Sequence, residues 1–559
     1  HEVIVDVGGN KTSSLVLDEI KKVGSFGNVK WIIPLGDGEL DGKNAIATMK
    51  KIKKIEKNPE ENIIFALKLF FLNTVVQKSI LDLNHGINIM FFIFIVVFLN
   101  AACLGQNGKS KGSIIKVDTS KISSKMDSYI KGYTDLDLFS GVVIIAYDGK
   151  PIYHKPFGLA DRERNIRVTP STKFLIGSMN KTFTQVVILQ LVSEGRLKLS
   201  DKLVDHIAGF QQPDAMKITV EHLLNHRSGF EDYFGPEYFN LPFDRKNIQG
   251  ITELLKNRSL DFIPGAREQY SNAGYILLGA IIEKVTGQSY SKNVKDRIIR
   301  KLNLKDIYTE HIDAIPDKSI GYLKTINGVE DNMEFITEPR SDGGFWATAS
   351  DILIFYRNFF YGNTLLSEKM KEPLEFFKRL NQVPPGKAIG MAGGMNGINT
   401  IYSEMPNEKI SIVVMANMDE PVAEKIASGI KQIITCQTPA PVAMPVKLVV
   451  YNEYKSNGIQ SIKDNFESLT SNFNHQEPKD AILNMLGYDL LQSGHLKEAL
   501  EMFKLNTELF PNIANCWDSY GEALLKSGNE KAALAAYEKA LSINPNIRSS
   551  QKAVKMLTK

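Results

Sequence analysis

The sequence has few cysteines, no cluster of histidines and little net charge, and each of these features excludes a class of protein. Only three cysteines occur, and none forms a C-x-x-C pair, which excludes a disulfide framework. The nine histidines are scattered without the spacing of metal ligands, so we expect neither a metal nor another cofactor. A net charge of +4 over 559 residues gives no reason to expect a nucleic-acid partner. With 43% hydrophobic and 23% charged residues, the chain is typical of a globular protein with several domains.

Long apolar runs are also scarce. The run at residues 90–102, MFFIFIVVFLNAA, is uncharged but shorter than the ~20 residues of a membrane-spanning helix. Its length is typical of the apolar part of a signal peptide, so residues 87–103 are predicted to be a signal peptide or membrane anchor. The residues before Cys103 resemble a bacterial lipoprotein cleavage site, which leaves lipidation of Cys103, plain cleavage and an uncleaved anchor as alternatives. The prediction places the protein in the periplasm or cell envelope, attached to the membrane near Cys103 if that cysteine is lipidated.

An export signal this far into the chain predicts that the natural start lies near Met90. Residues 1–86 then form an α/β fragment that is not part of the mature protein. The Gly-rich stretch at residues 8–13 lacks the full P-loop spacing, which favours an ordinary α/β fragment over a nucleotide site. Residues 104–121 are predicted to be a linker.

Residues 122–435 have the patterning of one large domain. The middle of this domain, about residues 200–330, is mostly helix and loop, while its two ends carry strand-like runs. The predicted strands are at residues 141–147, 151–156, 389–398, 400–404 and 410–416. We therefore expect an α/β (α+β) fold, with one antiparallel sheet flanked by helices and an additional all-helical lobe. A site is expected between the sheet and this lobe.

The C-terminal part follows a proline-rich linker, residues 436–456, and contains an internal repeat. Five residue pairs recur at a spacing of 34: Gly487 and Gly521, Gly494 and Gly528, Ala499 and Ala533, Phe503 and Tyr537, Pro511 and Pro545. This pattern resembles tetratricopeptide repeats, which are all-α. Residues 457–559 are therefore expected to form such a region, to which residues 458–469 add a half repeat, and to offer a surface for a protein partner.

Ser178 and Lys181 are the first candidates for chemistry. They are three residues apart at the start of the apolar stretch 174–195, so a helix there would place them on one face. The positive end of a helix stabilises negative charge on a reacting oxygen. The same Ser-x-x-Lys spacing recurs at Ser128, Ser289 and Ser549, so the spacing alone does not identify a site.

Tyr270 and Asn272 are the second candidates. They lie in a short polar loop directly before a predicted apolar helix at residues 275–285, where two polar side chains can be presented to a site. A phenol at Tyr270 could shuttle a proton to and from a serine, and Asn272 could hold Lys181 and a substrate amide.

Four segments together resemble the serine beta-lactamase-like family, which includes class C beta-lactamases, D-alanyl-D-alanine carboxypeptidases and esterases. They are FLIGSMNKTFT at 174–184, HLLNHRSGFEDY at 222–233, YSNAGYILLGAIIEKVTG at 270–287 and GGFWATASDILIFYRNF at 343–359. The resemblance implies that Ser178 is the acylated nucleophile, that Lys181 and Tyr270 transfer its proton, and that Asn272 anchors Lys181 and the substrate. It also implies an oxyanion hole formed by backbone N–H groups of Ser178 and of the family's third motif.

The third motif departs from the family pattern. Where the family has Lys-Thr-Gly or His-x-Gly, the aligned residues are Met391, Ala392 and Gly393, and Gly394 follows with its backbone N–H. We expect Met391, Gly393 and Gly394 to line the substrate site. A thioether cannot bind a carboxylate as an ammonium or imidazolium does, which puts penicillin and peptide carboxylates in doubt as substrates.

The sequence leaves two functions open. The first is an exported serine hydrolase acting on small ester, amide or peptide substrates. The alternative is a degenerate hydrolase domain that serves as a binding module beside the repeats, and Met391 is the feature that favours it. His222 and His226 are interpreted as packing residues rather than catalytic bases.

Overall fold

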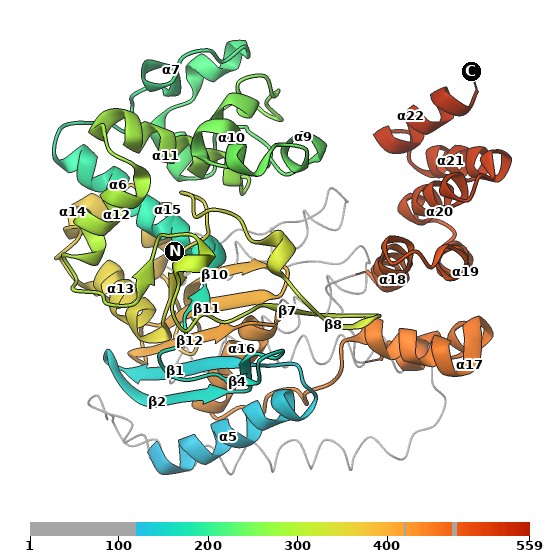
Figure 1. Cartoon of the computed structure of the whole chain (residues 1–559), viewed down its shortest axis with the longest axis horizontal. Coiled ribbons are helices and arrows are strands. Elements are labelled where there is room, and N and C mark those ends of the chain that lie inside the picture. The colour runs from blue at the N-terminus through green and yellow to red at the C-terminus, as the bar shows by residue number, and fades with distance from the viewer. Residues whose placement is uncertain (1–118, 419–420, 472–477, 559) are drawn as a thin grey trace, which may run out of the picture. The chain divides into compact units, whose positions relative to one another are not determined.

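The computed structural model describes residues 119–418, 421–471 and 478–558 (Figure 1). The predictions for residues 1–86 and for the segment that ends at Cys103 lie outside the described residues. Among the residues that are described, no helix combines the length and the apolar character needed to cross a membrane. The same part of the chain contains no group of three or more His, Cys, Asp or Glu side chains arranged to hold a metal ion.

Five antiparallel strands form the main sheet, in the order β10-β11-β12-β1-β2 that Figure 1 shows from top to bottom. The strands are β1 (Gly141–Tyr147), β2 (Lys150–Phe157), β10 (Ile389–Met395), β11 (Ile398–Met405) and β12 (Ile410–Ala416). The first strand of the domain pairs with the last, so that Ile144 lies opposite Val413. One antiparallel sheet built from both ends of the domain was predicted, and it is confirmed.

The interior strand β1, between β12 and β2, is buried on both faces because helices cover both sides of the sheet. Val142 and Ile144 belong to the larger apolar core, whereas Val143 and Ile145 belong to a second core with α5 (Thr119–Asp135) and α16 (Val422–Ile434). Successive side chains of a strand point to opposite faces, so a strand covered on both sides needs apolar residues at every position. The unbroken apolar sequence of β1, GVVIIAY, meets this need.

The larger core is built around α6 (Lys181–Ser193), which is apolar on most sides as the sequence predicted. The helix ends where Gly195 adopts a left-handed conformation with φ of 70°, which glycine tolerates best. The other helices around it are α7 (Leu203–His206), α8 (Val220–Leu224), α9 (Pro236–Phe239), α10 (Ile248–Leu255), α11 (Asn272–Thr286), α12 (Tyr290–Val294), α13 (Ala349–Tyr361), α14 (Glu368–Lys371) and α15 (Glu375–Leu380). These helices include the predicted helical lobe.

Short strands complete the domain. They are β3 (Leu159–Asp161), β4 (Ile166–Arg167), β5 (Phe174–Leu175), β6 (Ile307–Tyr308), β7 (Tyr322–Thr325), β8 (Gly328–Asp331) and β9 (Trp346–Ala347). β5 pairs with β9 immediately before the candidate serine, and this pairing fixes where the chain enters the site.

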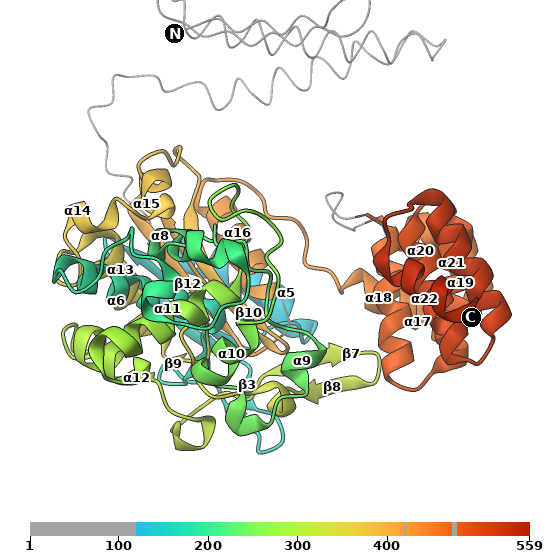
Figure 2. The ribbon, with the colours of Figure 1, turned by 90° about the horizontal axis from the view of Figure 1, so that it is seen from above.

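The C-terminal helices pack side by side (Figure 2). They are α17 (Val446–Leu469), α18 (Asp480–Gln492), α19 (Leu496–Leu509), α20 (Ala514–Lys526), α21 (Glu530–Ile543) and α22 (Arg548–Leu557). α17 begins within the predicted linker, directly after Pro445, and is interrupted at Gly458, where φ is 79°.

The period of 34 has a direct packing reason in these helices. A Cβ atom on Gly487 would come within 2.6 Å of the Phe503 ring, and one on Gly521 would come within 3.0 Å of the Tyr537 ring. The same small-to-aromatic contact therefore joins the two helices of each repeat, which accounts for two of the five residue pairs noted in the sequence.

Candidate active site

Ser178 lies on a short turn between the β5 strand and the α6 helix. The turn, η1 (Gly177–Asn180), is a 3₁₀ helix, and α6 begins only at Lys181. The sequence predicts one helix that carries both residues on one face, whereas Ser178 lies in this turn and Lys181 begins α6. The 3₁₀ geometry nevertheless keeps the predicted proximity, because residues three apart eclipse each other in such a helix. The Lys181 Nζ atom lies 2.9 Å from the Ser178 Oγ atom.

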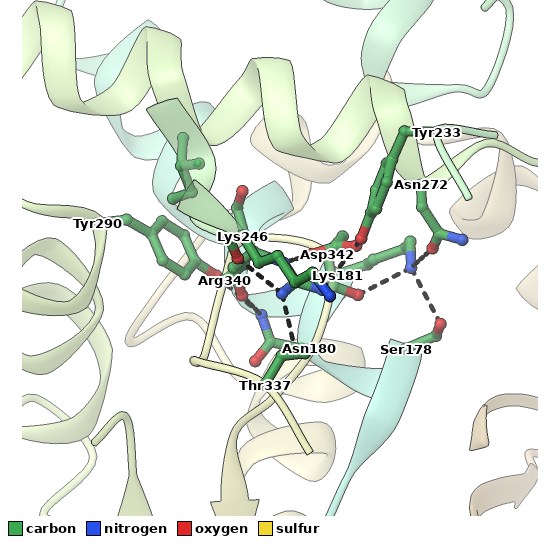
Figure 3. Close-up of polar contacts among 12 residues, drawn as sticks. Ser178, Asn180, Lys181, Tyr233, Lys246, Asn272, Tyr290, Thr337, Arg340 and Asp342 are labelled. Carbon is green, nitrogen blue, oxygen red and sulfur yellow. Dashed lines mark hydrogen bonds and ion pairs between the residues drawn. The ribbon is translucent and has the colours of Figure 1, made fainter. Parts of the chain in front are cut away.

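Lys181 is buried, with 5% of its surface exposed, and its amino group meets three oxygen atoms. Besides Ser178 Oγ, Nζ lies 2.6 Å from Asn272 Oδ1 and 2.8 Å from the Asp342 backbone oxygen (Figure 3). An ammonium group has three N–H donors and no acceptor. Each donor of a charged Lys181 therefore has one acceptor, which compensates for the loss of water around a buried amine.

Tyr270 approaches the serine from the other side. Its hydroxyl group lies 2.7 Å from Ser178 Oγ, and the Lys181 Nζ atom lies 5.0 Å from the centre of its ring. The Tyr270 side chain is 53% exposed, so solvent reaches this side of the serine. The structure thus brings Ser178, Lys181 and Tyr270 into direct contact across 92 residues of sequence.

Asn272 is the first residue of α11, not part of a loop before it. Ser271 caps the helix, with its side chain accepting the backbone N–H of Gly274, so the helix starts three residues earlier than the apolar pattern indicated. While Oδ1 of Asn272 faces Lys181, its Nδ2 atom points away (Figure 3) and donates to Asp232 Oδ2 at 2.5 Å. Burial raises the pKa of Asp232 above its ordinary value.

The third motif lies on β10, directly against the serine turn. A Cβ atom on Gly393 would come within 2.0 Å of the Ile176 oxygen and 2.9 Å of the Ser178 nitrogen, so only glycine fits there. Conversely, a Cβ atom on Gly177, whose φ is 52°, would come within 2.7 Å of the Gly394 nitrogen. The backbone nitrogens of Ser178 and Gly394 thus both lie where the serine turn η1 closely contacts the strand β10.

Met391 is two residues before Gly393 on the same face of β10. It is partly buried and packs against the larger apolar core. The structure therefore places Met391 on the strand that adjoins Ser178, but its side chain takes part in apolar packing.

The two histidines considered in the sequence analysis, His222 and His226, form hydrogen bonds with backbone groups near the site. His226 stacks on Tyr270, with ring centres 4.7 Å apart, and its Nδ1 atom accepts the Ser271 backbone N–H at 3.2 Å. Burial, assisted by the positive charge of Lys181, lowers the pKa of His226 to about 4. His222 Nδ1 accepts the backbone N–H of Thr219 at the start of α8.

Sequence reasoning missed a buried polar cluster behind Lys181 (Figure 3). Asp342, whose backbone oxygen contacts Lys181, has its carboxylate 3.4 Å from Arg340 Nε and accepts the Tyr233 hydroxyl at 2.5 Å. Arg340 Nη2 also donates to the Tyr233 oxygen at 3.0 Å. Burial and the Asp342 carboxylate raise the pKa of Tyr233 well above its ordinary value. The one sequence feature that pointed to this cluster is that Asp232 and Tyr233 belong to the family-like segment HRSGFEDY. The sequence does not show which residues these two side chains contact.

The neutral state of His226 predicts a loss of stability in acid. Its pKa of about 4 in the folded chain is below the ordinary 6.5, so between these values the unfolded chain binds a proton that the folded chain does not. Stability should therefore fall as the pH drops from 6.5 toward 4, by up to about 3 kcal/mol from this residue. The His226→Asn variant should lose less stability between pH 7 and 4.5 than the native chain, as measured by calorimetry.

The stability of His226→Asn at pH 7 provides the reference, because only the further loss between pH 7 and 4.5 reports on titration of the residue at this position. An equal acid-dependent loss in the native chain and in His226→Asn would show that His226 does not titrate in this range.

Comparison with known proteins supports the fold and the repeat region described above. The model of the beta-lactamase family matches residues 126–432, and the model of the tetratricopeptide repeat matches residues 514–547. Penicillin-binding protein 4* of Bacillus subtilis (strain 168) is 28% identical over 316 residues, which cover 50% of this chain and 69% of that protein. The teichoic acid D-alanine hydrolase of Staphylococcus aureus (strain MRSA252) is 31% identical over 208 residues, which cover 37% of this chain and 50% of that protein.

Among solved structures, the octameric penicillin-binding protein homologue from Pyrococcus abyssi superposes with a TM-score of 0.50 at 22% identity, covering 58% of this chain and 78% of that chain. At this identity the likeness shows the fold alone. The family match is broader, because it spans more than half of the 559 residues. The chain therefore belongs to the beta-lactamase family, a family that includes serine hydrolases, and it carries at least one tetratricopeptide repeat at its C-terminal end.

Proposed function

We propose that this chain is a serine hydrolase that acts through an acyl-enzyme on Ser178, with small esters or amides as substrates. The observation that supports this most strongly is that Ser178 Oγ is contacted by two groups able to exchange protons, Lys181 Nζ at 2.9 Å and the Tyr270 hydroxyl at 2.7 Å. A serine hydroxyl is a weak nucleophile until a neighbouring base accepts its proton.

The proposed reaction has two steps. In acylation, one member of the Lys181–Tyr270 pair is deprotonated before the reaction, and the pair accepts the single proton of Ser178 as its Oγ attacks the substrate carbonyl carbon. The leaving alcohol or amine takes that proton from the pair as its bond to the carbonyl breaks. In deacylation, the same pair takes a proton from water, whose oxygen attacks the acyl carbon, and returns the proton to Ser178 Oγ. We assign stabilisation of the oxyanion to the backbone N–H groups of Ser178 and Gly394, which adjoin the same contact.

The substrate class follows from Met391. Its thioether offers no charge to a substrate carboxylate, and its packing in the apolar core favours neutral acyl groups. One relative is named for removing D-alanine from teichoic acid and another for binding penicillin. We assign to this chain the hydrolysis of neutral esters or amides, with Asn272 and the Gly393 and Gly394 backbone lining the substrate.

The alternative function, a degenerate domain that only binds, is supported by Met391 alone. Against it stands the complete set of contacts among Ser178, Lys181, Tyr270 and Asn272. A protein that no longer needed acyl transfer would have no reason to keep a lysine buried beside a serine at the cost of desolvation. We assign partner binding to the repeat helices.

Acylation of Ser178 is the first expected outcome. A fluorophosphonate probe or an activated ester should add one adduct to the native chain, detected by intact-mass spectrometry, and none to Ser178→Ala. Tyr270→Phe should slow acylation by roughly 10²-fold or more, since it removes a proton-transfer group and keeps the ring. An adduct of equal yield on Ser178→Ala would rule out this serine as the nucleophile.

The second expected outcome concerns substrate choice. A cationic side chain at residue 391 would add a charge-assisted hydrogen bond to a substrate carboxylate, worth ~1.5 to 3 kcal/mol or roughly ten- to a hundredfold in binding. The native chain should hydrolyse neutral short-chain esters better than penicillins, and Met391→His should shift kcat/KM toward the penicillin, with Met391→Leu as the apolar control. Efficient penicillin turnover by the native chain, unchanged in Met391→His, would show that another residue binds the carboxylate.

The third expected outcome concerns location. We propose that the protein is exported to the cell envelope and that its mature form begins near Cys103, because residues 90–102 have the length of a signal peptide's apolar part. Sequencing the N-terminus of protein from its native host should then find a start near Cys103 and none of residues 1–89. Residues 1–86 still attached to that protein would contradict the proposal.

A further inference from the structure

Asp232 carries an inference that rests on the proposed function and extends it. We propose that Asp232 is a positioning residue: its carboxylate holds the amide of Asn272 in the one orientation in which Oδ1 faces Lys181. Asp232 itself contacts neither Ser178 nor the reacting atoms in this arrangement. It acts on Ser178 only through Asn272 and Lys181.

The contacts of Asn272 define the argument. Its Nδ2 atom donates to Asp232 Oδ2 at 2.5 Å, and its Oδ1 atom accepts from Lys181 Nζ at 2.6 Å. An ionised carboxylate only accepts hydrogen bonds, and an ammonium only donates them. An amide between the two satisfies both in one orientation, whereas a flipped amide would place oxygen against oxygen and N–H against N–H.

The carboxylate matters most when Lys181 is neutral. A neutral amine both donates and accepts, so it would tolerate either end of the Asn272 amide. In the proposed reaction Lys181 gains and loses a proton in each cycle. Its hydrogen bond therefore fixes the orientation of the Asn272 amide while it is charged and does not fix it while it is neutral. An ionised Asp232 is an acceptor in either state of Lys181, so it keeps Oδ1 in place for the return of the proton.

The segment around Asp232 supports this role through a second path. The neighbouring residue, Tyr233, donates its hydroxyl to Asp342 Oδ2 at 2.5 Å, and the Asp342 backbone oxygen is another acceptor for Lys181. Two adjacent residues thus support two of the oxygens around Lys181, one through Asn272 and one through Asp342. The segment is itself fixed by Arg258, whose Nη1 atom donates to the Asp232 backbone oxygen at 2.5 Å.

A double-mutant cycle tests the proposal, with the acylation rate of the full chain measured on p-nitrophenyl acetate. Asp232→Ala should slow acylation roughly ten- to a hundredfold, the scale of a hydrogen bond to a charged group, with KM nearly unchanged. Because Asp232 acts through Asn272, adding Asp232→Ala to Asn272→Ala should slow the reaction little further. Asp232→Asn, which keeps the shape and one acceptor, should lie between Asp232→Ala and the native chain. Glu231→Ala, at the exposed neighbour, is the matched control and should change nothing.

Other outcomes overturn the proposal in distinguishable ways. Multiplied losses in the double variant would show that Asp232 acts independently of Asn272. A loss confined to the D-alanine ester of p-nitrophenol, and absent for the propionate ester that lacks the ammonium group, would show that the carboxylate binds substrate instead. Unchanged acylation in Asp232→Ala, with Ser178 still labelled, would remove this role and leave the proposed function intact, whereas a native chain that is never acylated would remove both. If Asp232→Ala has a lowered melting temperature, the double-mutant cycle with Asn272→Ala is repeated with Asp232→Asn in its place.

Discussion

The burial of one amino group constrains the whole active-site region. Lys181 is removed from water, and its nitrogen can be accommodated only if oxygen atoms replace the lost solvent. Those oxygens come from three places: the serine turn, the first residue of α11 and the backbone at Asp342. They are 3, 91 and 161 residues from Lys181 in sequence, so only the complete domain brings them together.

Close backbone contact is the second constraint. Gly177 and Gly393 face each other where the serine turn meets the edge strand β10, and a Cβ atom on either would collide with the other segment. This contact brings the backbone N–H groups of Ser178 and Gly394 to one place without any side chain. Under the proposed function, a change of side chain at Met391 therefore alters substrate choice while leaving this backbone arrangement intact.

Local patterns in the sequence predicted what depends on local geometry. The spacing of three residues predicted that Ser178 and Lys181 lie close together. The apolar patterning of the sequence predicted the buried helix α6 and the strands at both ends of the domain. The apolar pattern predicts the start of α11 three residues too late, because the helix begins at Asn272, directly after its cap Ser271 and before the apolar run. The roles of Asp232, Tyr233 and Asp342 could not be predicted, since each depends on a partner 40 or more residues away that no spacing rule connects. Long-range polar pairs of this kind are set by tertiary packing and leave no periodic trace.

The central claim is that Ser178, Lys181 and the β10 backbone act together on one acyl group. A crystal structure of the chain reacted with a phosphonate ester tests it most directly, because the phosphoryl group mimics the tetrahedral intermediate. The account predicts a bond from phosphorus to Ser178 Oγ, one phosphoryl oxygen accepting from the N–H groups of Ser178 and Gly394, and Lys181 still in contact with Asn272 Oδ1. A phosphoryl group on another residue, or an oxygen turned away from Gly394 with Lys181 displaced from Asn272, would contradict the account.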